Sequence, residues 1–159
     1  MDPFDLLGLP ARLDLDAGMI ERAYLARAAS LHPDHAGEEG VEAAAGLNEA
    51  REVLSDPLRR ARALVERLGG GREAATEALP DGFLEVIMEA RLEVEEVMAS
   101  SDEEGVSRWK AWAREHAASR ASSVSVHLAR GDYRAVGVEL NAWKMIQRLI
   151  DALEGRGHP

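Results

Sequence analysis

The side chains with the clearest capacity for chemistry lie together in the stretch Leu-His-Pro-Asp-His, residues 31–35. His32 and His35 offer imidazole nitrogens that can bind zinc, and Asp34 adds a carboxylate between them. A metal site is disfavoured because a proline interrupts the helix, no third ligand is evident, and zinc usually takes three or four. A serine hydrolase is disfavoured because no Gly-x-Ser-x-Gly elbow occurs. Two interpretations are favoured over these: a helix end whose aspartate stabilises a turn, or a signal that another protein reads.

The composition limits the possible classes of protein. The 159 residues are 46% hydrophobic but only 4% aromatic, which favours a core of close-packed aliphatic helices. Cysteine is absent, which excludes disulfides and suits a reducing cytoplasm. The net charge of −10 is shared equally by residues 1–70 and 71–159, so a nucleic-acid partner is not expected. No signal peptide is recognisable at the start, and no apolar run approaches the ~20 residues of a membrane span.

The spacing of apolar residues predicts helices along the whole chain and no strand. Asp2 and Pro3 are typical of a helix start, and Gly8 of a helix end. Pro33 stops a long helix, Pro57 starts another, and the glycines at 69–71 indicate a domain boundary or hinge. Two of the last three predicted helices exceed ~20 residues and cannot be stabilised by propensity alone, so these helices should pack as an antiparallel bundle. The predicted helices span residues 2–9, 16–31, 41–54, 57–68, 81–99, 103–129 and 132–154.

The surroundings of the tripeptide resemble the J-domain of DnaJ-type co-chaperones. In that domain His-Pro-Asp lies in the loop between two antiparallel helices, and here His32, Pro33 and Asp34 lie between two predicted helices. Tyr24 stands at the usual tyrosine of the preceding helix, and LNEAREVLSDPLRRA follows in and after the next one. The resemblance implies that Pro33 holds His32 and Asp34 in a fixed, exposed geometry that stimulates ATP hydrolysis by a DnaK-type chaperone.

Two further segments, MDPFDLLGLPARLDLD and VLSDPLRRARALVERLG, are similar to the HscB family, the J-proteins of iron–sulfur cluster biogenesis. This resemblance covers nearly the whole chain. It implies an all-α, L-shaped protein with a J-domain in residues 1–70, formed by an antiparallel helical hairpin with short flanking helices. Residues 71–159 would form a three-helix oligomerisation and client-binding bundle. The implied partners are an HscA/DnaK-type chaperone and an IscU-like scaffold protein, with no cofactor, no metal, no membrane and no enzymatic activity.

The helix before the tripeptide departs from the usual J-domain pattern. J-domains carry a basic face there, but this helix has only Arg22 and Arg27, with Glu21 beside them. His35 also stands where lysine or arginine is common. Arg22 is expected to contact the chaperone, whereas Arg27 is either a contact or a solvated residue at the helix edge. The small number of basic residues predicts weak docking to the chaperone, or a dedicated chaperone with a matching surface.

The predicted helix 81–99 has more apolar surface than one core stripe requires. One row steps by three and four residues and should face the bundle. A second row, displaced by about 100°, contains Leu84, Met88 and Leu92. Either the helix is buried across a wide arc, or the second row is an exposed strip beside Glu85, Glu89 and Arg91 that binds another protein. The core row consists of Phe83, Ile87, Ala90, Val94 and Val97.

In HscB proteins the corresponding helix binds the scaffold through leucines and acidic residues. The resemblance therefore assigns client binding to this row and its neighbours, although Glu85 stands where an apolar residue is usual and Leu92 where an acid is common. HscB proteins also have an aromatic residue beside the strip, which Trp143 would match as an exposed anchor. The implied client-binding residues are Leu84, Met88, Glu89, Arg91, Leu92 and Trp143.

Three alternatives to an HscB-type co-chaperone remain open from the sequence. The first is a J-domain protein with a different client. The second is a helical metal-dependent hydrolase that uses His32 and His35. The third is a helical adaptor in which the His-Pro-Asp loop has no function.

Overall fold

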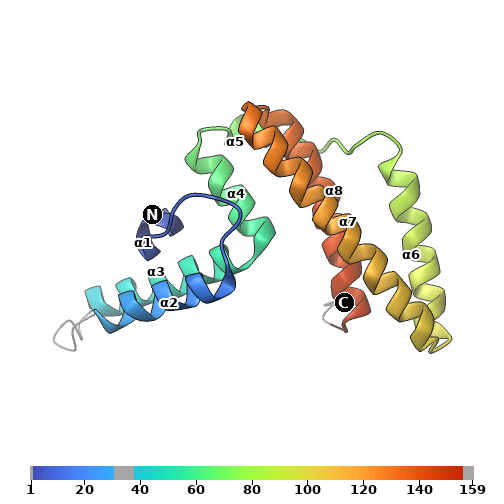
Figure 1. Ribbon diagram of the computed structural model, residues 1–159, viewed down its shortest axis with the longest axis horizontal. Coiled ribbons are helices and arrows are strands. Elements are labelled where there is room, and N and C mark those ends of the chain that lie inside the picture. Colours follow the sequence, from blue (N-terminus) through green and yellow to red (C-terminus); the bar gives the residue numbers. More distant parts are fainter. Residues whose placement is uncertain (1, 31–37, 156–159) are drawn as a thin grey trace. The chain divides into compact units, whose positions relative to one another are not determined.

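The computed structural model describes residues 2–30 and 38–155, and all regular secondary structure in these ranges is helical. The all-α prediction is therefore confirmed. The chain forms two compact units, Met1–Gly71 and Arg72–Pro159. The helices are α1 Pro3–Leu7, α2 Ala17–Ala29, α3 Glu38–Ser55, α4 Pro57–Arg67, α5 Gly71–Ala74, α6 Phe83–Ala99, α7 Glu103–Arg130 and α8 Tyr133–Leu153 (Figure 1).

Aspartate side chains begin most of these helices. Each accepts one or two hydrogen bonds from backbone N–H groups of the first turn, which have no partner within the helix. The predicted start at Asp2–Pro3 and the predicted end at Gly8, whose φ is 66°, are both present. The predicted start at Pro57 is also present, with Asp56 as the cap of α4. The capping residues are Asp2, Asp16, Asp56, Asp102 and Asp132.

Several helix ends differ from the predicted positions. The helix α2 ends at Ala29, because the N–H and hydroxyl of Ser30 both bond back to the carbonyl of Arg27. The helix α3 begins at Glu38, three residues before the first apolar position, where acidic residues favour the start of a helix. The helix α6 begins at Phe83 because Gly82 takes the left-handed conformation. Apolar periodicity carries no information about any of these three ends.

The helices α2 and α3 form an antiparallel hairpin. The Tyr24 hydroxyl donates a 2.7 Å hydrogen bond to Asn48, and Arg51 lies 3.6 Å from Glu21. A step of three residues forward along α2 thus matches a step of three backward along α3. The short helix α1 packs on both helices of the hairpin (Figure 1). The hairpin with short flanking helices agrees with the predicted architecture of this unit.

The core of the N-terminal unit encloses one charged side chain. Arg60 of α4 is buried, and its Nη1 donates hydrogen bonds to the carbonyls of Leu15 and Leu54, at 3.1 and 2.9 Å. Burial lowers the pKa of this guanidinium from its usual value. Arg60 therefore joins the segment before α2 and the end of α3 to α4. The apolar part of the core is Phe4, Leu7, Leu15, Ile20, Leu47, Ala50, Leu54, Leu58, Ala61, Leu64 and Val65.

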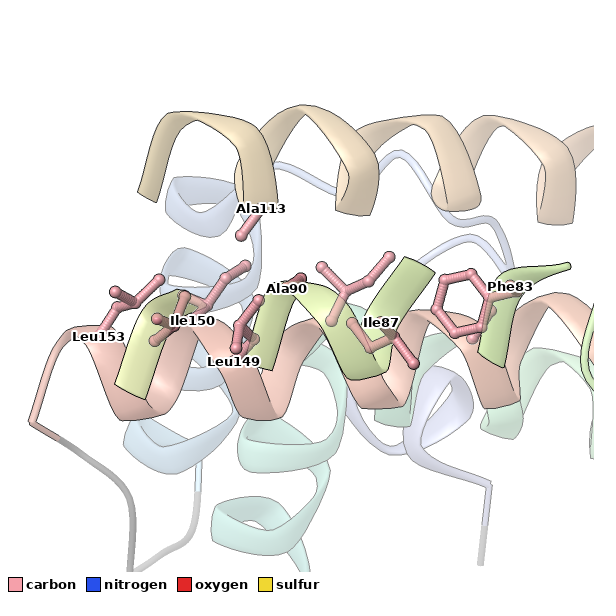
Figure 2. Close-up of a cluster of buried hydrophobic side chains, with 10 residues drawn as sticks. Phe83, Ile87, Ala90, Ala113, Leu149, Ile150 and Leu153 are labelled. Carbon is pink, nitrogen blue, oxygen red and sulfur yellow. The ribbon is translucent and has the colours of Figure 1, made fainter. Parts of the chain in front are cut away.

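The C-terminal unit is a three-helix bundle with a single apolar cluster. The helices α7 and α8 lie side by side along their length, and α6 packs against both. Figure 2 shows Ala113 of α7 pointing towards the side chains of α6 and α8. The cluster buries the predicted core positions of α6, while Val97 is half-buried. Its members are Phe83, Ile87, Ala90, Val94, Ala113, Ala142, Ile146, Leu149, Ile150 and Leu153.

The segment between α5 and α6 is attached to the first half of α8. Asn141 Nδ2 donates hydrogen bonds to the carbonyls of Thr76 and Ala78, at 2.7 and 3.0 Å. At Gly137 any Cβ would collide with the carbonyl of Ala74, so a glycine is needed for this close approach. These contacts fix the entry of the chain into α6. No helix within residues 2–30 and 38–155 combines the length and apolarity needed to cross a membrane.

Candidate functional site

The predicted chaperone-contact residues His32, Pro33 and Asp34 lie outside the described residues. The helices on either side of them are described, and their side-chain pairs establish an antiparallel hairpin in which α2 leads into this segment and α3 leads out. The segment therefore connects the ends of two packed helices. The role of the three residues stays a prediction.

One face of α2 is exposed to solvent and holds the fourth predicted contact. Arg22, Leu25, Ala26 and Ala29 recur at intervals of three and four residues and are all exposed. The Arg22 guanidinium lies 4.0 Å from the Asp16 carboxylate, at the limit of an ion pair, and its side chain is 75% exposed. The guanidinium is therefore available to an acidic partner.

Leu25 is the residue of this face that sequence reasoning missed. Its side chain is 56% exposed, although α2 packs on both α1 and α3. A signal existed in the sequence, because Ile20, Ala23 and Tyr24 form one apolar stripe of the helix and Leu25 falls outside it. Arg27, in contrast, lies against Gly8 at the end of α1, where an added Cβ would meet its guanidinium. This arrangement favours a local role for Arg27 over a docking role.

Tyr24 takes part in a small network that holds the hairpin together. The Arg51 guanidinium lies over the tyrosine ring, 4.4 Å from its centroid, and also pairs with Glu21. The tyrosine hydroxyl bonds to Asn48. A cation over an aromatic face and a hydrogen bond at its edge together define the orientation of the ring. The network sets the register of α2 on α3 and so orients the exposed face of α2.

The second row of α6 is exposed. Leu84, Met88 and Leu92 are 54%, 50% and 66% accessible, whereas Phe83 and Ile87 of the first row are 7% or less. The helix is therefore buried along one stripe, and the alternative of burial across a wide arc is wrong. We call Leu84, Met88 and Leu92 the α6 strip. Glu85, Glu89 and Arg91 are exposed beside it, as the sequence predicted.

Comparison with known proteins adds to this geometry. Residues 2–63 match the family model described as DnaJ domain. The co-chaperone protein HscB homolog of Bordetella petrii is 34% identical, over 96% of this chain and 94% of the relative, and that of Vibrio cholerae is 31% identical, over 97% and 95%. The chain belongs to the HscB co-chaperone family. Its members are named as co-chaperones, and this chain is accordingly a co-chaperone rather than an enzyme.

Solved HscB structures have the same fold. The chaperone HscB from Vibrio cholerae superposes with a TM-score of 0.81 at 28% identity, over 98% of this chain and 96% of that one. Human co-chaperone HscB gives a TM-score of 0.78, over 98% of this chain and 82% of that one. At 18% identity the human protein supports the fold alone.

In this HscB-family chain, one predicted client-binding residue is not where sequence reasoning expected it. Trp143 is buried, with 7% of its surface accessible, so the exposed anchor expected there is absent. The cause is a wide buried arc on α8, which packs against two helices. The buried residues of this arc include Leu140, Ala142, Trp143, Leu149 and Ile150. Trp143 would therefore influence a client only through the packing of α8.

The described residues give the metal-site interpretation no support. No three histidine, aspartate or glutamate side chains converge within residues 2–30 and 38–155. The His116 ring stacks on Trp112 at 3.9 Å between centroids, and its Nδ1 lies 2.9 Å from the carbonyl of the same residue. His116 thus has a structural explanation, while His32 and His35 lie outside the described residues.

Proposed function

We propose that this co-chaperone stimulates the ATPase of an HscA/DnaK-type chaperone and delivers an IscU-like iron–sulfur scaffold protein to it, in the cytoplasm. Residues 1–70 would act as the J-domain and residues 71–159 as the client-binding bundle. The observation that carries the proposal is the exposed α6 strip in a bundle whose core is already closed by the other row of α6. Large apolar side chains gathered on one exposed face are typical of a protein interface.

The chaperone would be contacted through His32, Pro33 and Asp34 together with Arg22. Stimulation requires that the J-domain bind the hydrolysis-competent conformation of the chaperone more tightly than the other conformation. A stimulation of ~1000-fold corresponds to about 4 kcal/mol of differential binding. Charge-assisted contacts from Asp34 and His32 would supply part of this difference.

The client would be contacted through Leu84, Met88 and Leu92, with Glu89 and Arg91 at the border of the strip. The α6 strip lies on the same chain as the J-domain. Once either the client or the chaperone has bound, its encounter with the other partner therefore takes place within one complex. The effective concentration of client at the chaperone is then set by the chain itself rather than by bulk concentration.

A steady-state ATPase assay of the cognate chaperone, with scaffold present, tests this function. Asp34→Asn should abolish stimulation while circular dichroism and scaffold binding stay as in the wild type. Glu49→Gln is a matched control, because it removes one exposed carboxylate from α3 of the same unit. Full stimulation by Asp34→Asn would reject the proposal, as would equal losses in both variants.

A further inference from the structure

A groove of about 240 Å³ lies between α6 and α8 in the C-terminal unit. Its floor contains the buried residues Val94 and Leu149. Met98 of α6, which is 44% exposed, and the half-buried Met145 of α8 provide apolar walls. Methionine side chains are flexible and polarisable, and they adapt to the shape of a partner.

The groove is continuous with the α6 strip. Met88, Arg91, Glu95 and Met98 recur at intervals of three and four residues, so they lie along one face of α6. Met88 belongs to the α6 strip, one turn after Leu84, whereas Arg91, Glu95 and Met98 line the groove. A partner that covers the strip and follows α6 towards its C-terminal end therefore meets the groove next.

The charges of the groove favour an acidic occupant. Arg91 and Arg148 line it, and Glu95 is the single carboxylate among its lining residues. In the described part of the chain no carboxylate is within 4.0 Å of either guanidinium. This small positive region is set in a chain whose net charge is −10. Arginine suits such a site because its planar fork recognises a carboxylate with two hydrogen bonds.

The volume favours side chains of a protein over a small molecule. Pockets for drug-sized ligands usually measure about 300–1,000 Å³, and this groove is smaller at about 240 Å³. A second copy docked groove to groove is a poorer occupant, because a symmetric contact would bring the same pair of guanidinium groups against Arg91 and Arg148.

We propose that this groove extends the client-docking surface onto α8, and that it receives a segment of the scaffold in which an apolar side chain is followed by a carboxylate. The apolar side chain lies against Met98 and Met145, and the carboxylate pairs with Arg148 and Arg91. This inference rests on the proposed function, since the occupant is the same client that covers the α6 strip.

Titration of a purified IscU-like scaffold protein against charge-reversal variants tests the groove. Arg148→Glu should weaken scaffold binding by about tenfold and reduce its dependence on salt concentration. Arg134→Glu is the matched control, because it reverses the charge of another exposed arginine on α8, about 21 Å along the helix. Its affinity should stay within twofold of the wild type. Met98→Gln keeps the length and helix propensity of the side chain and should weaken binding several-fold.

The strip variant Leu84→Ser/Met88→Ser separates failure of this inference from failure of the proposed function. If that variant loses binding while Arg148→Glu and Met98→Gln bind as the wild type does, the groove is not part of the interface and the proposed function stands. Equal weakening by Arg148→Glu and Arg134→Glu would indicate a general effect of charge and would also overturn the proposed role of the groove.

Absence of wild-type binding at ~100 µM scaffold overturns both proposals. A wild-type dimer that Arg148→Glu converts to monomer, seen by sedimentation, would assign the groove to a second copy and contradict the inference.

Discussion

The helices within each of the two units are stabilised by different kinds of interaction. In the N-terminal unit α1, α2 and α4 have 5, 13 and 11 residues, lengths that are marginal on their own, and polar contacts join the helices at defined points. Arg67 of α4 pairs with Asp2 and Asp5 of α1 at 2.9 Å each, and Arg60 binds two backbone carbonyls. The C-terminal unit also has ion pairs between its helices, but its long helices share one continuous apolar cluster. Because the buried row of α6 already completes this cluster, the bundle leaves the α6 strip in solvent without losing its core.

The exposed surfaces of the two units also differ in their content of charged and apolar side chains. The outer face of α2 combines one guanidinium with a single large apolar side chain, Leu25. The α6 strip presents three large apolar side chains and continues into the groove beside α8. A charged surface mainly governs the rate of encounter, whereas buried apolar contacts mainly govern the lifetime of a complex. With a single guanidinium on the α2 face, we expect weak, salt-sensitive docking of the chaperone, and we expect slower dissociation of the client.

The largest effect should come from the buried row of α6. Ile87 is fully buried, so Ile87→Ala should lower the free energy of unfolding by about 3 kcal/mol, from lost burial and the cavity left behind. Leu92→Ala, five residues further along the same helix, should change it by less than about 0.5 kcal/mol. Urea unfolding followed by circular dichroism measures both values. Similar losses for the two variants would mean that the two rows of α6 are not distinct.

The next largest effect should be the loss of client affinity from the strip. Leu84→Ser/Met88→Ser should weaken scaffold binding at least 30-fold, which corresponds to about 2 kcal/mol. Most of the change should be a faster dissociation rate, measured by surface plasmon resonance. Val126→Ser removes another exposed apolar side chain, 47% accessible on α7, and should leave binding unchanged. Equal losses in both variants would point to nonspecific apolar association.

A smaller effect is expected on the face of α2. Arg22→Glu should slow association with the chaperone about tenfold at low salt and much less at high salt, because exposed charges are screened. Arg62→Glu reverses the charge of an exposed arginine on α4 and serves as the control. Stopped-flow association rates at two salt concentrations decide the matter. A tenfold effect that persists at high salt would indicate a short-range contact instead of electrostatic steering.

The smallest effect concerns the cap of α1. Burial alone would raise the pKa of Asp2, but hydrogen bonds from Arg67 and from the backbone of Asp5 and Phe4 outweigh burial and lower it. Its stabilising contribution is thus fully present above the usual carboxyl pKa of about 3.9 and is lost as the pH falls through the lower folded value. Asp2→Ala should cost about 1 kcal/mol at pH 7. The difference from wild type, measured by thermal unfolding between pH 7 and pH 2, should shrink towards the acid end, and a constant difference would contradict this origin.

Much of the fold could be predicted because it depends on local signals. The caps at Asp2 and Gly8, the start at Pro57 and the two rows of α6 all follow from spacing and residue type within one helix. The DnaJ-domain match over residues 2–63 and the HscB relatives confirm the family that the tripeptide and its flanking segments indicated.

The remaining features depend on neighbours that one helix does not reveal. Arg60 has the same propensity as Arg59 and Arg62 beside it, and only the position of the Leu15 and Leu54 carbonyls selects it for burial. Trp143 is buried because two helices cover α8. The groove beside Arg148 likewise exists only when α6 and α8 are placed together.

We propose that client binding and chaperone activation act together because both surfaces belong to one chain. Its most direct test is the scaffold-dependent ATPase rate of the chaperone with an equimolar mixture of Asp34→Asn and Leu84→Ser/Met88→Ser proteins. In this mixture the Asp34→Asn protein retains an intact α6 strip and the strip variant retains an intact J-domain, so the two intact surfaces lie on different chains. We predict that scaffold brings no increase in the rate of the mixture beyond that of the strip variant alone. Restoration of the wild-type rate by the mixture would contradict the account.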